Sequence, residues 1–551
     1  MSYDLLTSLY YGETSNADLV DEASRRKLHV RTRLDDKLPT FAREGLSIVL
    51  TGNPGDGKSH LVRKLCDDGE LHDAVIELDL SAKPTKQIVA DWSAATRAGR
   101  PYVLCANQGP LAGLIEEMRG SEVLEVARAE LASQLGAVTT ARPEELPPRP
   151  SQVVLIDLAD RNLLDAELLE DAIGVLCTPG FLPPLSFTIQ NQTSAARNQT
   201  LLAYAPTAKR RLADLLAVAG RRAGGHFTFR HIWSAIAFAL TAAKKPSTLQ
   251  SEHYAGRVGI DCFPLSYLTR DSGPNQGNGP LIAAVKAHAD PARVALPDLD
   301  EEVWSFGEPR RGRWLDERIE DVIKGREPPA KRWERGEQEE ALETFRHLKR
   351  LVALAHERGE QLIEEVLGVD SRLPSAMSPD DLKELAITGI QRLYLTSSEQ
   401  RSARPWLRDS LCLWVGHTYL DVPGEERAHV AVTALPKTDF EVLRPQRVPW
   451  LAGSLGAPLE LAWLIHKPSQ IALRLEPELL ATLEEARSSD GPISLPERVQ
   501  RFLTQLAGWE ERHHGASFMG DNLAVLERPR GAIVTVGSVD FDMDDRAFYA
   551  D

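Results

Sequence analysis

Residues 47–59 read SIVLTGNPGDGKS, and this segment constrains the fold of the chain more than any other. Apolar and β-branched residues fill 48–50, and a loop of the form G-x-x-x-x-G-K-S then runs from Gly52 to Ser59. The pattern predicts a buried strand, a tight glycine turn and a helix from His60 to Leu65, because the glycines allow a backbone path that other residues rarely adopt. We therefore expect a sheet in which this loop follows the carboxyl end of a buried strand.

The loop is expected to bind phosphate. Its glycines let successive backbone N–H groups face one anion, and the N-terminus of the following helix adds partial positive charge behind it. Lys58 would reach the β- and γ-phosphates, and the Ser59 hydroxyl would bind Mg²⁺, so ATP and Mg²⁺ are the predicted cofactors. The predicted nucleotide-binding residues are Gly52, Asn53, Pro54, Gly55, Asp56, Gly57, Lys58, Ser59 and His60. The alternative is a chance glycine-rich turn.

Composition places the chain among soluble proteins. It has 551 residues, 42% of them hydrophobic and 26% charged, which predicts about three or four domains. No apolar stretch approaches the ~20 residues that cross a bilayer, and the N-terminus lacks the pattern of a secretory signal. The five cysteines are scattered, which favours reduced thiols over disulfides or a zinc site. We expect a cytoplasmic protein with no membrane partner.

The first third of the chain predicts an α/β fold. Short apolar runs alternate there with helical stretches, and continuous rather than alternating polarity is typical of strands buried on both faces of a mainly parallel sheet. The runs are IVL at 48–50, VIELDL at 75–80, YVLCAN at 102–107, VVLID at 153–157 and FTIQN at 187–191. The expected fold is a P-loop NTPase core followed by a helical lid and a C-terminal mixed α and β region.

Changes in pattern along the chain predict five parts. They are a helical lead-in at 1–45, the P-loop core at 46–198, a helical lid at 199–250, a loop-rich and helical middle region at 251–378, and a mixed α and β domain at 379–551. The proline-rich segment at 142–150 is interpreted as an exposed insertion, because the following strand must rejoin the sheet.

An acidic residue follows the fourth apolar run. VVLID brings Asp157 to the carboxyl end of a strand beside the loop strand, where it would organise Mg²⁺ and water. Ser59 and Asp157 are therefore the predicted metal ligands. The usual second acid is replaced by Leu158, and Asp160 is the nearest substitute, so the catalytic base stays open. A helix or turn cap is the alternative role of Asp157.

Two asparagines and an arginine could supply the remaining groups that ATP hydrolysis needs. Asn191 ends the strand FTIQN and could hold the attacking water, and Asn107 at the end of YVLCAN is its rival. Either could instead bond a loop backbone. Arg230 begins a lid helix, from which it could swing onto the nucleotide, unless it is an ordinary exposed helix arginine. The predicted catalytic set is Asp157, Asn191 and Arg230.

Other charged residues have weaker interpretations. A formal net charge of −16 disfavours a broad nucleic-acid surface but allows a local one. The candidate basic patch comprises Arg310, Arg311, Arg313, Lys324, Arg326, Lys331, Arg332 and Arg335. Neighbouring acids favour a solvated, salt-bridged linker there instead. Arg161, Arg210 or Arg211 could act on a second subunit's nucleotide, and the alternative for each is an ordinary surface charge. His513 and His514 are adjacent on a predicted helix and so face different ways, and no third ligand lies nearby in sequence, which disfavours a metal site there.

The motifs together resemble the AAA+ group of P-loop ATPases over residues 45 to about 245. The resemblance rests on GNPGDGKS, VVLID, the strand ending in Asn191, and a helical lid with FTFR. The segments VIELDLS, CANQGPL, IDLADRN, FTFRHIWSAIA and DPARVALPDLD resemble the DptF-like ATPases of bacterial DNA phosphorothioation-dependent restriction and related phage-defence systems. Leu158 departs from the commonest AAA+ form.

This resemblance implies an ATPase that regulates or powers a DNA-directed defence complex of restriction type. Its partners would be ATP, other defence-system proteins, and DNA bound either through a local basic patch or through those proteins, with a homo-oligomer left open. Two alternatives remain: a nucleotide-dependent signalling or assembly switch with slow turnover, and a small-molecule kinase. The large C-terminal half and the separate lid disfavour the kinase.

Overall fold

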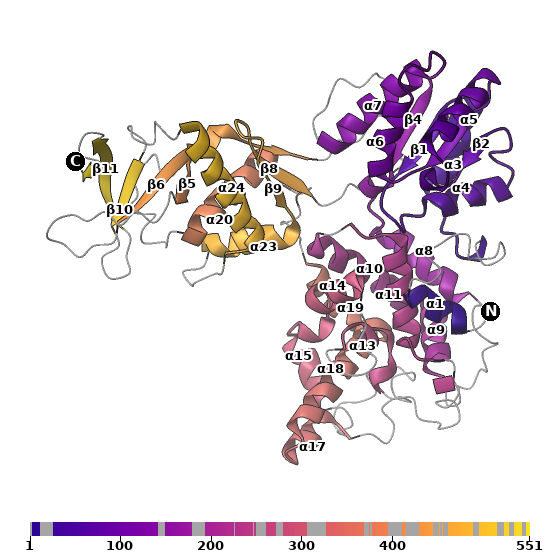
Figure 1. The fold of residues 1–551 in the computed structure, drawn as a ribbon. Helices are drawn as coiled ribbons and strands as arrows, with labels where there is room; N and C mark the ends of the chain where they lie inside the picture. The colour runs from indigo at the N-terminus through magenta and orange to yellow at the C-terminus, as the bar shows by residue number, and fades with distance from the viewer. Residues whose placement is uncertain are drawn as a thin grey trace. The chain divides into compact units, whose positions relative to one another are not determined.

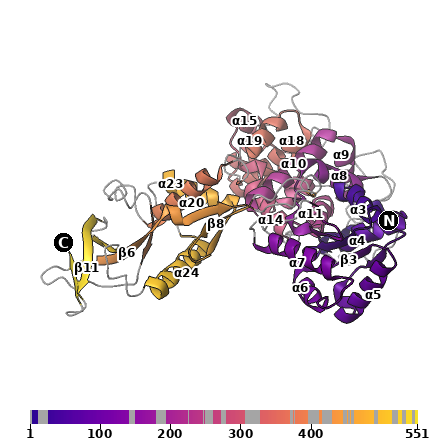
Figure 2. The ribbon, with the colours of Figure 1, turned by 90° about the horizontal axis from the view of Figure 1, so that it is seen from above.

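A computed structural model of the chain divides it into two compact units (Figures 1 and 2). The first comprises Met1–Val369 and Gln446–Leu459, and the second Asp370–Pro445 and Glu460–Asp551. The structure describes residues 3–11, 26–140, 149–178, 193–224, 226–245, 247–248, 260–270, 279–305, 327–368, 374, 377–394, 410–414, 429–444, 451, 455, 461–488, 495–514, 523–527, 534–542 and 547–550.

The first unit contains a four-stranded parallel sheet in the order β2-β3-β1-β4. The strands are β1 (Ser47–Thr51), β2 (Val75–Glu77), β3 (Tyr102–Cys105) and β4 (Val153–Asp157). The predicted α/β class with a parallel sheet is therefore confirmed, and so is the prediction that VVLID lies beside the loop strand. The fifth predicted strand, at 187–191, lies outside the described residues.

Both faces of this sheet are covered by helices, as continuous apolar strands predict. Ile48 and Leu50 of β1 share a core with α3 and α4, whereas Val49 points into a second core formed with α5, α6 and α7. In Figure 2, α3 and α4 lie on one side of β3, and α5 and α6 lie on the other. The helices are α3 (Arg33–Arg43), α4 (Lys58–Asp67), α5 (Thr85–Arg97), α6 (Gln108–Glu117) and α7 (Glu125–Thr140).

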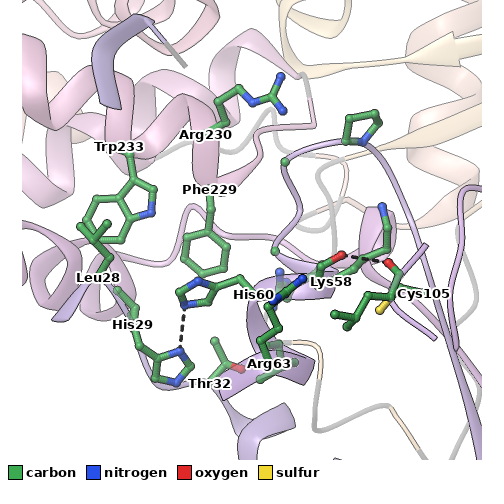
Figure 3. A pocket seen from close by; sticks show the side chains of 18 of the residues that line it. Leu28, His29, Thr32, Lys58, His60, Arg63, Cys105, Phe229, Arg230 and Trp233 are labelled. Carbon is green, nitrogen blue, oxygen red and sulfur yellow. Dashed lines mark hydrogen bonds between the residues drawn. The ribbon is translucent and has the colours of Figure 1, made fainter. Parts of the chain in front are cut away.

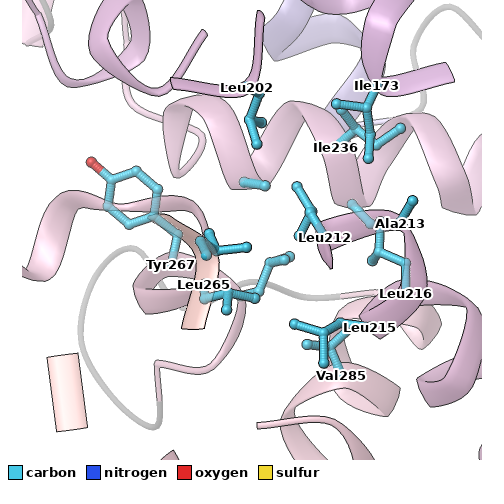
Figure 4. Packing of buried hydrophobic residues seen from close by; sticks show 14 of the residues in the cluster. Ile173, Leu202, Leu212, Ala213, Leu215, Leu216, Ile236, Leu265, Tyr267 and Val285 are labelled. Atoms are coloured by element: carbon cyan, nitrogen blue, oxygen red, sulfur yellow. The ribbon is translucent and has the colours of Figure 1, made fainter. Parts of the chain in front are cut away.

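The remainder of the first unit is helical and shares one apolar core, part of which Figure 4 shows. Its helices include α1 (Tyr3–Tyr11), α8 (Ala166–Cys177), α9 (Ser194–Tyr204), α10 (Pro206–Ala223), α11 (Phe229–Thr241), α13 (Pro264–Leu268), α14 (Pro280–His288), α15 (Pro297–Trp304), α18 (Gln338–Ala355) and α19 (Gly359–Leu367). Helix α17 (Pro329–Glu334) packs on α18. The predicted lid and the predicted middle region therefore pack together as one helical body.

Helix α1 also belongs to this body. Tyr10 stacks on Phe238 of α11 with ring centroids 5.1 Å apart, and the Ser234 hydroxyl donates to the Tyr10 carbonyl at 3.1 Å. The start of the chain thus packs against the predicted lid helix.

The second unit is mixed α and β with antiparallel strands. One sheet has the order β12-β11-β10-β6-β5 and the other β7-β8-β9. The strands are β5 (Ser410–Trp414), β6 (His429–Pro436), β7 (Phe440–Leu443), β8 (Ala462–His466), β9 (Ala472–Leu475), β10 (Leu523–Glu527), β11 (Val534–Asp542) and β12 (Ala547–Ala550). Helices α20 (Pro379–Tyr394), α23 (Pro477–Ser488) and α24 (Glu497–His514) join strand residues in its core. Across the described parts of both units, no helix combines the length and apolarity that a membrane span requires.

Candidate functional site

A cavity of about 390 Å³ opens at the glycine-rich loop in the first unit (Figure 3). Its volume lies within the range typical of small-ligand sites. The loop, the ends of β2 and β3, the segment before α3 and the start of α11 all contribute to its wall. Lining residues with chemistry of interest are His29, Asp35, Lys58, Ser59, His60, Arg63, Asp79, Asn107, Arg161, Phe229, Arg230 and Trp233.

The loop follows the path that its glycines predict. Gly52, Gly55 and Gly57 have φ of 136°, 95° and 86°, in the region that favours glycine. A Cβ at Gly55 would lie 3.1 Å from the Thr228 hydroxyl and 3.2 Å from the Cβ of Arg230. Small residues are thus needed both for the turn and for the close approach of the α11 start.

Lys58 is folded back over the loop. Its amine donates to the carbonyls of Gly52 at 2.9 Å and Asn53 at 3.0 Å, and to the side-chain oxygen of Asn107 at 3.2 Å. All three acceptors are neutral. Burial lowers the pKa of Lys58, although the nearby charge of Asp56 opposes this shift. A partly desolvated ammonium with neutral partners is a favourable place for an anion.

Ser59 faces the end of β2. Its hydroxyl donates to the Leu78 carbonyl at 3.2 Å, and the next residue, Asp79, lines the cavity. The Asp79 carboxylate accepts from the backbone N–H of Ser81 at 2.9 Å and from its hydroxyl at 2.5 Å. The sequence interpretation missed Asp79, although VIELD is also an apolar run that ends in an acid.

Asp157 lies where its strand predicts, paired with Thr51 at the end of β1. It is 4% exposed, and its carboxylate accepts from the backbone N–H of Ala159 at 2.9 Å, as a turn cap does. It is not among the residues that line the cavity. The cap is therefore observed, and the metal role of Asp157 stays a prediction.

Of the two candidate asparagines, Asn191 lies outside the described residues. Asn107 follows β3, occupies the N-cap position of α6 and contacts Lys58. The structure thus brings Asn107, the alternative candidate, to the loop.

Arg230 lies at the start of α11 and lines the cavity together with Phe229 and Trp233 (Figure 3). Its Nε is buried without a hydrogen-bond partner, and no ion pair joins it to a carboxylate within the described ranges. A buried N–H group without an acceptor is costly, and an anion bound beside Arg230 would supply that acceptor. The alternative of an ordinary exposed helix arginine is wrong, because the residue is partly buried against Gly55.

Two of the other candidate arginines are buried within their own unit, which removes the exposure that contact with a second subunit requires. Arg161 is 5% exposed, donates to the Asp56 carbonyl at 2.5 Å and lies 5.2 Å from the ring centroid of Phe229. Burial lowers the pKa of Arg161 to about 10. Arg211 is 4% exposed and donates to the His356 carbonyl at 2.6 Å, just after α18. Arg210 is exposed, and its Nε lies 3.4 Å from an Asp214 oxygen.

Another part of the cavity wall carries aromatic rings and imidazoles. The rings of Phe229 and Trp233 have centroids 6.5 Å apart. His29 lies between His60, at 3.3 Å, and the Asp35 carboxylate, at 2.6 Å. Burial opposes ionisation of Asp35, yet hydrogen bonds from His29 and Thr32 hold its pKa below the ordinary value. This wall offers flat apolar surfaces and polar edges to a ligand.

The two described arginines of the candidate basic patch are salt-bridged. Arg332 lies 3.0 Å from Glu340, and Arg335 pairs with Glu327 and, at 3.1 Å, with Glu337. Five predicted members lie outside the described residues: Arg310, Arg311, Arg313, Lys324 and Arg326. For the described arginines, the linker interpretation therefore fits better than a free cationic surface.

Comparison with protein-family models, curated proteins and solved structures found no match for this chain.

Proposed function

We propose that this chain binds ATP with Mg²⁺ in the cavity and hydrolyses it. The observation that carries the proposal is a pair of cations, Lys58 and Arg230, that line the cavity at one glycine loop. Among the described residues, no carboxylate is hydrogen-bonded or ion-paired to either of them. A triphosphate supplies the negative charge that both need, and the backbone N–H groups and helix start of α4 add to the same field.

The remaining wall supports a nucleotide rather than free phosphate. The cavity continues from the loop to the rings of Phe229 and Trp233 and to His29 and His60. Aromatic faces are suited to stack on a nucleobase, and their polar neighbours are suited to bond a sugar or base edge. A site for inorganic phosphate would need no such extension.

Hydrolysis requires a metal site, a positioned water and charge stabilisation. Ser59 would hold Mg²⁺ together with an acid, for which Asp157 is the predicted residue and Asp79 the competitor that lines the cavity. The metal would neutralise developing phosphate charge when bound. Asn107 would orient the water or the γ-phosphate, and Arg230 would stabilise the charge that develops on transfer.

We further propose, on the resemblance of the motifs, that turnover serves a DNA-directed defence complex. The test is steady-state phosphate release by the purified chain with Mg²⁺ or EDTA, and with or without DNA and partner proteins. Mg²⁺-dependent release that DNA or partners stimulate supports the full proposal. Nucleotide-dependent assembly without turnover favours the switch, and phosphate transfer to a metabolite favours the kinase. Failure to bind any nucleotide would overturn the proposal altogether.

A further inference from the structure

Asp56, inside the loop, is fully buried and links three parts of the first unit. Its Oδ2 accepts from the backbone N–H of Asn53 at 2.5 Å, and its Oδ1 lies 2.7 Å from Nε2 of His226, just before α11. Its carbonyl accepts from Arg161, in the connection after β4. One loop residue therefore joins the loop to the segment that leads into the predicted lid helix.

The charge of Asp56 does not help the loop to bind phosphate. It acts on Lys58 more strongly than Asp157 or Asp79 does, so it would also repel an anion at that amine. Burying a carboxylate is costly unless it is paired and hydrogen-bonded. The favourable contribution of Asp56 must therefore come from the contacts it makes.

Those contacts lead directly to Arg230. His226 stands four residues before it. Its Nδ1 is buried and has no hydrogen-bond partner among the residues that the structure describes, so the imidazole is held through the Asp56 bond. Between them, the N–H of Thr228 donates to His231 at 3.2 Å and Phe229 packs against Gly57. His226 and Phe229 therefore tie the entry to α11 to the loop.

We infer that the Asp56–His226 pair positions Arg230 over the loop and thereby gives the site its preference for a triphosphate over a diphosphate. The inference rests on the proposed function. Asp56 and His226 act through Arg230 and are positioning residues. When the pair is intact, Arg230 lies beside Gly55. In the proposed role of Arg230, the terminal phosphate of a triphosphate gains from this position. When the pair is broken, the phosphates nearer the sugar keep their contacts with Lys58 and the loop.

The test is the ratio of ADP to ATP dissociation constants, measured by calorimetry on the full chain and on three variants, His226→Ala, Arg230→Ala and the double variant. We expect His226→Ala to lower the ratio about tenfold, a magnitude typical of site coupling, while ADP binding is kept. The double variant should match Arg230→Ala alone, because both changes remove the same contact. His226→Gln, whose amide can still donate to Asp56, should restore most of the ratio.

Additive losses in the double variant, or an unchanged ratio in His226→Ala, would overturn the inference. So would a wild-type protein that binds ATP and ADP equally. Lack of any nucleotide binding by the wild type would instead contradict the proposed function. If His226→Ala does not fold, His226→Leu replaces it, because leucine fills much of the same volume without a donor, and the same outcomes apply.

Discussion

The Lys58 amine lies 3.2 Å from the side-chain oxygen of Asn107. The contact joins the loop after β1 to the residue that precedes α6, across a separation of 49 positions in sequence. It links the lysine of the loop to the end of the neighbouring strand, β3. Asn107 is therefore the residue whose removal should separate binding from hydrolysis.

We expect Asn107→Ala to keep ATP binding within a few-fold and to lower turnover on the order of 10²-fold, as loss of one positioned polar group does. Phosphate release and calorimetry on the same preparation check this. Asn162→Ala is no fair control, because Asn162 is buried and its side chain accepts from Leu164. The exposed Gln87→Ala is suitable. Equal losses of affinity and turnover would make Asn107 a simple binding residue.

The two carboxylates make a direct comparison. Asp157→Asn should leave ATP binding measurable and lower hydrolysis on the order of 10²-fold or more, because Mg²⁺ would lose its acid. Asp79→Asn is measured beside it over a Mg²⁺ titration. Wild-type turnover in a folded Asp157→Asn protein would show that Asp157 acts only as a turn cap, through its hydrogen bond from Ala159. A raised Mg²⁺ requirement in Asp79→Asn alone would assign the metal to Asp79.

The loop strand and its helix were predictable because the pattern is local. An apolar run, three glycines and a lysine within 13 residues determine strand, turn and helix regardless of the rest of the chain. The place of Asp79 was not predictable, since it depends on the order β2-β3-β1-β4, which brings the end of β2 toward Ser59. Sheet order follows from packing between segments distant in sequence.

The contacts of Asp56 illustrate the same limit. Its partners Arg161 and His226 lie 105 and 170 positions away, and no spacing rule links them. The helical body gives a further case, because Lys349 and Arg350 look like solvent-facing charges. They are 1% and 6% exposed, Lys349 pairing with Asp300 and Arg350 binding Asp290 at 2.7 Å.

Gly55→Ala should weaken nucleotide binding through the α11 contact. An alanine Cβ would press on Thr228 and Arg230 in addition to the backbone strain at φ 95°. We expect a stability loss of about 1–3 kcal/mol by urea denaturation, with lowered ATP affinity. Gly69→Ala is the matched control, because Gly69 has φ 77° and no atom within 4 Å of an added Cβ. Equal effects of both changes would show that backbone strain alone is responsible.

His347 should make the first unit sensitive to acid. Burial, with the charge of Arg350 nearby, lowers the pKa of His347 to about 4, while its Nδ1 lies 2.9 Å from the Ser266 hydroxyl. In the unfolded chain the imidazole binds a proton near pH 6.5. Stability is therefore fully present above about pH 6.5 and is lost as the pH falls toward 4, by up to ~3 kcal/mol.

His347→Gln should flatten this loss, since its amide stays neutral over the same range. Denaturant unfolding between pH 4 and 7 gives the profile, and the same change at the exposed His72 serves as control. An unchanged profile in His347→Gln would mean that other groups cause the acid sensitivity.

The central claim is that Lys58 binds a nucleotide phosphate, and calorimetry of ATP with Mg²⁺ on wild type and Lys58→Ala tests it most directly. Lys86→Ala is the control, because Lys86 is exposed and lies outside the cavity. We predict that the wild type and the control bind ATP alike. Lys58→Ala should lose affinity on the order of 10²-fold, as expected when a charge-assisted hydrogen bond in a partly buried site is removed. Equal ATP binding by a folded Lys58→Ala protein would contradict the account.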